Sequence, residues 1–353
     1  MIKVLVGGAG GTGGNNFIRS LKKEKEFYVV GMTSNKNHVF LSEADETYYM
    51  PPARGGNYID NLVFLIKKTK PDFIYAYHDF EVEKLSENRE ILDNLNVKYF
   101  LPSKSVIRNL VNKYYTNKIW KDRGIYVPDT IILNTKDDLI KILNKYSKIW
   151  IRNVEGGGGD GSLPTDDYNF AKAWIDHFEG WGKFSATKCL STKRVSFTSI
   201  WDDGNLIIAQ TREGLSWLLG DKSLSGVTGV TDKGITIDNE EINELSIKAI
   251  KSIDEKPNGI YTVDISYDYE GNPIPTEINP GRFFTPINFF TELGLNFPMI
   301  YTYLALNMKE KIKLPSKKIN PLPNNLCWLR NVDTLPKVVN LEDIENLKYP
   351  YNK

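Results

Sequence analysis

Two carboxylates and one amide lie on a predicted β-hairpin near residue 270. One strand-like run (261–267) carries Asp264, and a second (273–279) carries Glu277 and Asn279. The residues between the two runs include Asp, Gly and Asn, which supply the positive φ that such a reversal needs. Paired strands bring facing side chains within roughly 5 Å, so these three side chains can converge their oxygen atoms on one point.

Oxygen ligands of this kind suit Mg²⁺, which normally keeps waters and takes one or two carboxylates together with phosphate oxygens. The hairpin therefore predicts a nucleotide as well as a metal. Arg282 follows directly after Pro280-Gly281, and a cation at this place is useful beside a transferring phosphoryl group. The alternative is a solvated hairpin with acids at its rim, and Arg282 favours the phosphoryl site over it.

Composition limits the class of protein. The chain has 353 residues with 41% hydrophobic content, enough for a sizeable core and two or three domains. Lys and Arg number 45 against 44 Asp and Glu, so bulk charge predicts neither a nucleic-acid nor a membrane partner. Cys189 and Cys327 can form at most one disulfide, which fits a reducing compartment. We see no signal-peptide pattern and no run of about 18 apolar residues, and expect a cytoplasmic protein.

The order of predicted elements indicates how the chain is divided. Residues 1–100 alternate strand and helix signals, the last of them a helix at about 82–94, which predicts parallel strands joined by right-handed crossovers in a doubly wound sheet. We place the end of this first domain near residue 104. Short strands and helices follow up to the hairpin, and a helix is expected over 286–308. The last forty residues are rich in proline and are expected to pack as strands and loops.

The first glycine segment, Gly8–Gly13, follows a strand and opens a helix, as in the G-x-G-x-x-G dinucleotide fingerprint. An NAD(P) site also needs an acidic residue about 20 positions further on, and the second strand ends at 31–36 without Asp or Glu. We therefore favour either a tight structural turn or a helix N-terminus that receives an anionic group of the substrate.

The second glycine segment, residues 156–159, has four consecutive glycines, which one turn does not explain. It predicts a mobile loop that folds over phosphates and excludes water, and Arg152 on the preceding strand would contact a phosphate oxygen. A flexible linker is the alternative. The Gly-Lys-Ser/Thr of a Walker A loop is missing.

A glycine loop after a basic residue, followed about a hundred residues later by Asp264 and Glu277-Ile278-Asn279-Pro280, resembles the ATP-grasp superfamily. The chain looks most like the enzymes related to the large subunit of carbamoyl phosphate synthetase and to carboxylate–amine ligases, over roughly residues 1–310. The resemblance implies an α/β and α+β fold with three parts: a Rossmann-like pre-ATP-grasp domain (1–104), a two-subdomain ATP-grasp domain (105–312) whose mobile lid spans about 125–188, and a C-terminal extension (313–353) packed on the body.

The resemblance also gives roles to individual residues. Those implied to bind ATP lie at the start of a helix, on the strand before the lid, in the lid, and in the hinge that contacts adenine through its backbone: Lys113, Arg152, Gly156, Gly157, Gly158, Gly159, Ser162, Lys188, Cys189 and Leu190. Asp264 and Glu277 match the two metal carboxylates, Asn279 the third ligand and Arg282 the cation near the reacting phosphate. The chain departs from the family in two ways. No acid follows the hinge to hold the ribose, and Gly281 stands between Pro280 and Arg282.

The function implied is an ATP-dependent ligase that phosphorylates a carboxylate to an acyl phosphate and joins it to an amine, with Mg²⁺ or Mn²⁺. Its partners would be a small-molecule carboxylate and a small-molecule amine, and a homodimer is compatible with this function. Two rivals are an NAD(P)-dependent oxidoreductase that uses Gly8–Gly13 and a non-catalytic nucleotide-binding protein. Finally, His78 and Asp79 follow a strand at the edge where open α/β sheets bind ligands, so either could touch the second substrate; Asp79 could instead cap a helix.

Overall fold

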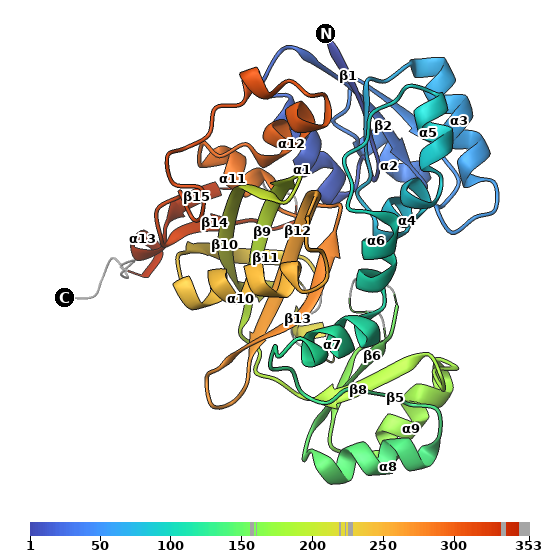
Figure 1. Cartoon of the computed structure of the whole chain (residues 1–353), viewed down its shortest axis with the longest axis vertical. Coiled ribbons are helices and arrows are strands. Elements are labelled where there is room, and N and C mark those ends of the chain that lie inside the picture. Colours follow the sequence, from blue (N-terminus) through green and yellow to red (C-terminus); the bar gives the residue numbers. More distant parts are fainter. Residues whose placement is uncertain are drawn as a thin grey trace.

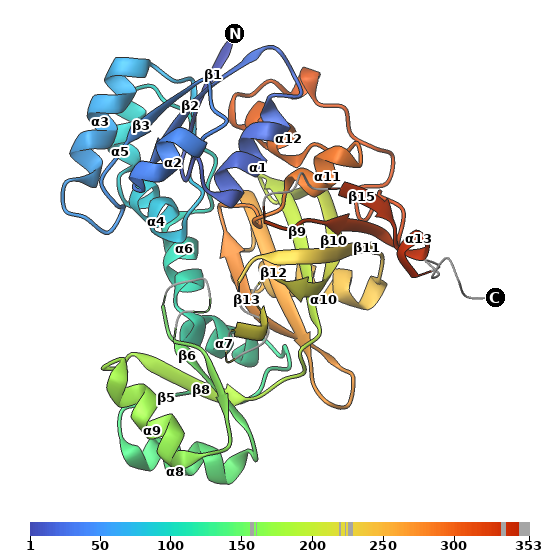
Figure 2. The same ribbon diagram turned by 180° about the vertical axis from the view of Figure 1, so that it is seen from behind.

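The computed structural model describes residues 1–155, 159, 161–218, 220–222, 224, 229–332 and 337–345. Within this part of the chain, three β-sheets organise the fold, one parallel and two antiparallel. Figures 1 and 2 show the parallel sheet and one small antiparallel sheet at opposite ends of the molecule, with the largest sheet between them. No helix in the described ranges is both long and apolar enough to cross a membrane.

The parallel sheet has the strand order β3-β2-β1-β4. Its strands are β1 (Ile2–Val6), β2 (Phe27–Thr33), β3 (Glu46–Tyr49) and β4 (Phe73–Tyr75), and its helices are α1 (Thr12–Leu21), α2 (Lys36–Leu41), α3 (Tyr58–Thr69), α4 (Asp79–Glu87) and α5 (Arg89–Asn94). The alternation predicted from the sequence is confirmed. The stretch expected as one helix over 82–94 is two helices that meet at Asn88.

The small antiparallel sheet has the order β5-β8-β6-β7 and packs against two helices. Its elements are β5 (Ile131–Ile132), α8 (Lys136–Lys145), β6 (Ile149–Asn153), β7 (Leu163–Thr165), α9 (Tyr168–His177) and β8 (Phe184–Lys188). Two helices, α6 (Lys104–Val111) and α7 (Lys113–Asp122), connect it to the parallel sheet. Along the chain, the glycine segment at 156–159 stands between β6 and β7, two strands of the same sheet, and this position argues against a linker between domains.

The seven-stranded sheet has the order β13-β12-β9-β10-β11-β14-β15, and α10 covers one of its faces. Its strands are β9 (Arg194–Asp202), β10 (Asn205–Trp217), β11 (Thr231–Ile237), β12 (Gly259–Tyr267), β13 (Pro273–Pro280), β14 (Leu326–Leu329) and β15 (Lys337–Asn340). Its helices are α10 (Glu240–Lys251), α11 (Asn288–Glu292), α12 (Phe297–Ala305) and α13 (Leu341–Glu345), with 3₁₀ turns at Gly220–Lys222 and Lys309–Lys311. The prediction of a single helix over 286–308 is therefore wrong. Gly294, at φ +89°, stands between α11 and α12.

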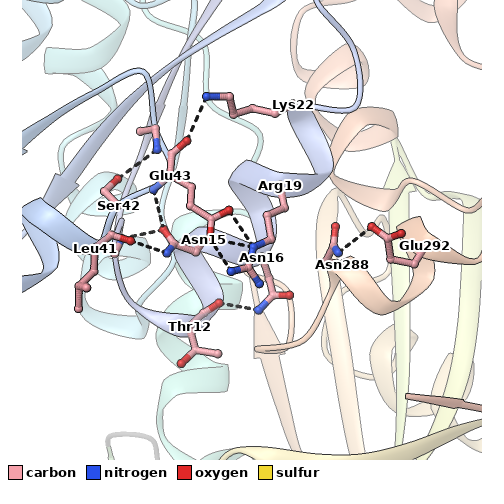
Figure 3. Close-up of polar contacts among 12 residues, drawn as sticks. Thr12, Asn15, Asn16, Arg19, Lys22, Leu41, Ser42, Glu43, Asn288 and Glu292 are labelled. Carbon is pink, nitrogen blue, oxygen red and sulfur yellow. Dashed lines mark hydrogen bonds and ion pairs between the residues drawn. The ribbon is translucent and has the colours of Figure 1, made fainter. Parts of the chain in front are cut away.

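Helix α1 joins the parallel sheet to the helices of the large sheet. The ring of Phe17 on α1 stacks on that of Tyr75, and its centroid lies 6.2 Å from the ring centroid of Phe283. All three residues belong to one continuous core. Polar contacts continue this join: the Ser20 hydroxyl donates to Asn288 Oδ1 at 3.0 Å. Figure 3 shows Arg19 paired with Glu43, in the connection between α2 and β3, on one side of α1, and Asn288 on the other. The edge of the parallel sheet is thus fixed against the large sheet, although the domain limits at 104 and 312 stay predictions.

Glu81 on α4 makes the stability of the protein depend on pH in a way that can be measured. Its carboxylate accepts the backbone N–H groups of Tyr77 (3.0 Å) and His78 (3.2 Å) beneath Gly7, where a Cβ would come within 2.2 Å of Oε2. Burial raises the pKa of Glu81 from 4.5 to about 7, and the two N–H groups oppose that shift. Because the folded state holds the proton more tightly than the unfolded state, the stability contributed by Glu81 is complete below about pH 4.5 and lost as the pH rises through about 7.

The free energy of unfolding of the wild type should fall by up to roughly 3 kcal/mol between about pH 5 and pH 8. We therefore expect a smaller fall in Glu81→Gln over the same range. Urea unfolding at both pH values measures it. Glu90→Gln, at an exposed position of α5, is the control and should keep the wild-type dependence. A Glu81→Gln protein with the wild-type dependence would contradict the assignment.

Candidate active site

The acid-bearing hairpin forms as the sequence predicts. Strands β12 and β13 pair antiparallel, with Asp264 opposite Glu277 and Thr262 opposite Asn279. The Asn279 side-chain amide donates to Asp264 Oδ2 at 2.9 Å, and the hydroxyl of Ser196 on the neighbouring strand β9 donates to Asp264 Oδ1 at 2.6 Å. The three predicted ligand residues are therefore adjacent in space.

The charges of the two acids are held in different ways. Burial, followed by repulsion from Glu277, raises the pKa of Asp264 to about 6. Burial would also raise the pKa of Glu277, but Lys113 and Arg152 outweigh it and hold that pKa below its usual value. Each of these two cations lies 3.8 Å from Glu277 Oε2. The pair thus combines one firmly ionised carboxylate with one whose ionisation a bound cation would favour.

This donor set fits Mg²⁺. No group of three or more His, Cys, Asp or Glu that could hold a metal occurs in the described ranges, so a protein-only cage is not found there. Two carboxylates are what Mg²⁺ usually takes when phosphate oxygens complete its shell. The oxygen of Asn279 accepts a hydrogen bond from Arg282 at 2.6 Å, and it could join a metal only after releasing that bond.

Arg282 ties the hairpin to the parallel sheet. Its guanidinium forms a two-point ion pair with Asp79, the first residue of α4, with one of the bonds at 3.1 Å to Oδ2. Burial lowers the pKa of Arg282, but the Asp79 carboxylate outweighs it and raises the pKa above its usual value. The cap that we considered for Asp79 is wrong: the imidazole of His78 accepts from the N–H of Phe80 and caps α4.

Lys113 and Arg152 reach the site from two further elements. Lys113 begins α7, whose N-terminus is capped by the side chain of Asn112. Arg152 lies on β6 and donates to the carbonyl oxygen of Thr276 at 3.1 Å. Their side chains are only 13% and 17% exposed, and this burial lowers the pKa of both cations. Buried cations beside a carboxylate pair favour an anionic ligand.

A cavity of about 490 Å³, within the range of small-ligand sites, brings most of the predicted residues together. The predicted residues that line it are Lys113, Arg152, Gly159, Ser162, Lys188, Leu190, Asp264, Glu277, Asn279 and Arg282. Cys189 does not line it, and its N–H donates to the carbonyl oxygen of Lys148 at 3.0 Å. Gly156, Gly157 and Gly158 lie outside the described residues.

Several cavity residues carried no signal in the sequence. Ser196 and Arg212 face the site because β9 lies next to β12 in the sheet and β10 lies next to β9, an order that the local pattern does not give. The ion pair of Asp79 with Arg282 was not predicted either, since the two residues lie 203 positions apart along the chain. His78 lines the cavity, as contact with a second substrate would require, and that contact stays a prediction.

The first glycine segment has a structural explanation. Gly8 and Gly10 adopt positive φ (+65° and +78°), as a tight strand-to-helix turn requires. A Cβ on Gly13 would come within 1.8 Å of the Tyr77 ring, and one on Gly10 within 1.9 Å of the carbonyl oxygen of His38. The protein itself occupies the space beside these glycines, and none of Gly8–Gly13 lines the cavity. This packing favours the structural turn over the NAD(P) site.

Comparison with known proteins supports the fold. No family model matches the chain. It is 24% identical over 316 residues to the uncharacterized protein MJ0776 of Methanocaldococcus jannaschii, covering 86% of this chain and 80% of that one. Among solved structures, it resembles the biotin carboxylase–β-γ-ATP complex of Campylobacter jejuni, with 17% identity, a TM-score of 0.65 and coverage of 92% and 74% of the two chains.

Two further solved structures are similar. Carboxyaminoimidazole ribonucleotide synthase from Aspergillus clavatus, complexed with ATP, has 16% identity, a TM-score of 0.68 and coverage of 93% of this chain and 81% of that chain. L-amino acid ligase from Bacillus licheniformis has 13% identity, a TM-score of 0.66 and coverage of 93% and 79%. These likenesses show the ATP-grasp fold, so the fold class and the resemblance predicted from the motifs are confirmed at the level of the fold.

Proposed function

We propose that this protein is an ATP-dependent ligase that joins a small carboxylate to an amine through an acyl phosphate. The observation that carries the proposal is the cavity itself, which brings Asp264 and Glu277 together with Lys113, Arg152 and Arg282. Facing acids suit a divalent cation, and the surrounding buried cations suit a polyphosphate. The ATP and MgADP complexes of similar folds support the same ligand.

Each residue would have a distinct task. Lys113 and Arg152 would bind phosphate oxygens, and Asp264, Glu277 and, on release of its bond to Arg282, Asn279 would hold Mg²⁺ or Mn²⁺. When bound, the metal would neutralise phosphate charge. Arg282, held by Asp79, would stay close to the transferring phosphoryl group.

The remaining predicted residues would complete the nucleotide site. The backbone of the hinge would contact adenine, with Lys188 and Leu190 placed on the cavity wall. The lid that includes Gly159 and Ser162 would exclude water. Exclusion of water is needed because an acyl phosphate hydrolyses readily.

The reaction has two steps. A carboxylate oxygen of the substrate attacks the γ-phosphorus of ATP, and the bond to the bridging oxygen breaks to release ADP. The amine then attacks the acyl carbon, the C–N bond forms, the bond to the phosphate oxygen breaks, and the amine loses a proton. Phosphorylation is needed because a carboxylate oxygen is a poor leaving group. No side chain has to act as a nucleophile.

The test is thermal stabilisation by ATP, GTP, ADP, NAD and NADP, each with and without Mg²⁺, because a ligand of the native state raises the melting temperature. We expect a Mg²⁺-dependent shift with ATP or ADP, followed by a screen of carboxylate–amine pairs for ADP release. A shift with NAD or NADP alone would overturn the proposal.

Arg152→Ala gives a sharper prediction for the phosphate site. We expect it to lose most of the melting shift caused by Mg-ATP, because the guanidinium of Arg152 is buried in the cavity beside Glu277. The melting temperature without ligand should change less. Arg108→Ala, at an exposed position of α6, is the control and should keep the full shift. Equal Mg-ATP shifts in the Arg152→Ala and wild-type proteins would contradict the assignment.

A further inference from the structure

Arg212 on β10 is a buried cation without a direct ion pair among the described residues, although the charge of Asp264 attracts it from a greater distance. Its side chain lines the cavity, and the residue is only 8% exposed. Its Nε atom has no hydrogen-bond partner, and no Asp or Glu of the described residues lies within ion-pairing distance. Its guanidinium carbon stands 4.3 Å from the centroid of the Phe284 ring, so an aromatic face holds one side of the group in place.

Three other arginines of the cavity have polar partners. Arg282 is paired with Asp79, and Arg152 contacts Glu277 and a carbonyl oxygen. Arg194 donates to the hydroxyl of Ser266 and to backbone oxygens. A buried charge that lacks such partners destabilises the protein unless a ligand supplies them.

A second guanidinium increases the need for an anion. Arg330, after β14, donates from Nε to the carbonyl oxygen of Thr231 at 2.8 Å, and its buried Nη2 has no partner. Burial lowers the pKa of Arg330 to about 10, and Arg212 is close enough to lower it further. Burial likewise lowers the pKa of Arg212 to about 10, so both groups remain positive at neutral pH.

The sheet places Arg212 in line with the metal acids. Ser196 pairs with Asp264 on one side and with Arg212 on the other, so Glu277, Asp264, Ser196 and Arg212 form one row across β13, β12, β9 and β10. Facing residues of paired strands project on the same side of a sheet, and neighbouring strands lie roughly 4.8 Å apart. Arg212 therefore stands about 10 Å along the row from Asp264, measured between backbones.

We propose that Arg212 binds the carboxylate of the substrate that is to be phosphorylated; Arg330 does not line the cavity and would act only through its positive charge. This inference rests on the proposed ligase function. A guanidinium presents two parallel N–H groups that match a carboxylate, and the row places that carboxylate beside the acids that would hold the metal and the phosphates. The phosphates have their own cations in Lys113 and Arg152 at the other end of the row, each 3.8 Å from Glu277 Oε2.

The test compares melting temperatures of the full chain with acetate, bicarbonate, glutarate or inorganic phosphate, without nucleotide and with chloride balancing the ionic strength. We expect carboxylates to stabilise the wild type and to leave Arg212→Met unchanged. Arg54→Met is the matched control, since Arg54 also lines the cavity and stacks on a phenylalanine (3.7 Å) but is exposed. It should keep the carboxylate shift.

Arg212→Met without ligand should melt at or above the wild-type temperature, because an uncompensated buried charge has been removed. A merely structural role predicts the opposite. If Arg212→Met does not fold, Arg212→Lys keeps the charge but loses the planar fork, and it should show a smaller carboxylate shift.

Three outcomes would overturn the proposal: no carboxylate shift in the wild type, a full carboxylate shift in the Arg212 variants, or a shift with phosphate alone, which would assign Arg212 to the nucleotide. A parallel Mg-ATP arm distinguishes the two failures: no Mg-ATP shift in the wild type would contradict the ligase proposal, whereas a Mg-ATP shift without a carboxylate shift would contradict the Arg212 proposal alone.

Discussion

Glu277→Gln is expected to lower Mg-ATP-dependent ADP release by roughly 100-fold or more while the protein stays folded. The carboxylate of Glu277 faces Asp264 across the hairpin and is the charge that Lys113 and Arg152 approach to 3.8 Å. Glutamine keeps the size of the side chain but removes the negative charge that would hold the metal. Without that charge, no single group would position both the phosphates and the cations around them.

The fold should survive this substitution because both contacts of Glu277 are long, at 3.8 Å, and its side chain is 30% exposed. Glu213→Gln on β10 is the matched control: Glu213 lies in the same sheet, pairs with Lys193 at 3.7 Å, and does not line the cavity. It should keep wild-type ADP release and melting temperature. Near wild-type activity in Glu277→Gln would show that the metal assignment is wrong.

The hairpin could be predicted from the sequence because its information is local. Strand alternation and the turn residues between 267 and 273 set the register, and the register places Asp264 opposite Glu277. The same holds for the alternating strands and helices of the first hundred residues. In both cases, neighbours in space are also close in the chain.

The other half of the site depends on contacts that no local pattern contains. Ser196 reaches Asp264 because β9 lies beside β12 in the sheet although two other strands separate them along the chain, and Arg212 joins the same row because β10 pairs with β9. Asp79 meets Arg282 across 203 positions. Sheet order and domain packing are set by the whole core, so these partners could not be predicted from spacing.

Two errors in helix length have a local physical cause. Asn88 ends α4 and begins α5, and Gly294 at φ +89° stands in the turn between α11 and α12. Both stretches keep apolar residues at helical spacing, so hydrophobic periodicity alone predicts one continuous helix in each. Asparagine and glycine tolerate the backbone of a helix end, and here they override the pattern.

The Asp79–Arg282 pair gives the second large effect, this time on stability. The two side chains are 19% and 18% exposed and bond at two points, so removing one partner leaves a buried charge uncompensated. We expect Asp79→Asn to reduce the free energy of unfolding by about 3 kcal/mol or more. Turnover should fall as well, since Arg282 would no longer be held beside Asn279. Urea unfolding of the ligand-free protein measures the first effect.

A double-mutant cycle separates this pair from general damage to the fold. Asp79→Asn combined with Arg282→Met should cost less than the sum of the two single changes, because the second removes the charge that the first leaves unpaired. Lys118→Met breaks an exposed pair with Asp122, at 2.8 Å and about 60% exposure, and should change stability by less than about 1 kcal/mol. Additive losses in the cycle would mean that the pair does not hold the parallel sheet to the hairpin, and Arg282 would then need another group to aim it at the phosphate.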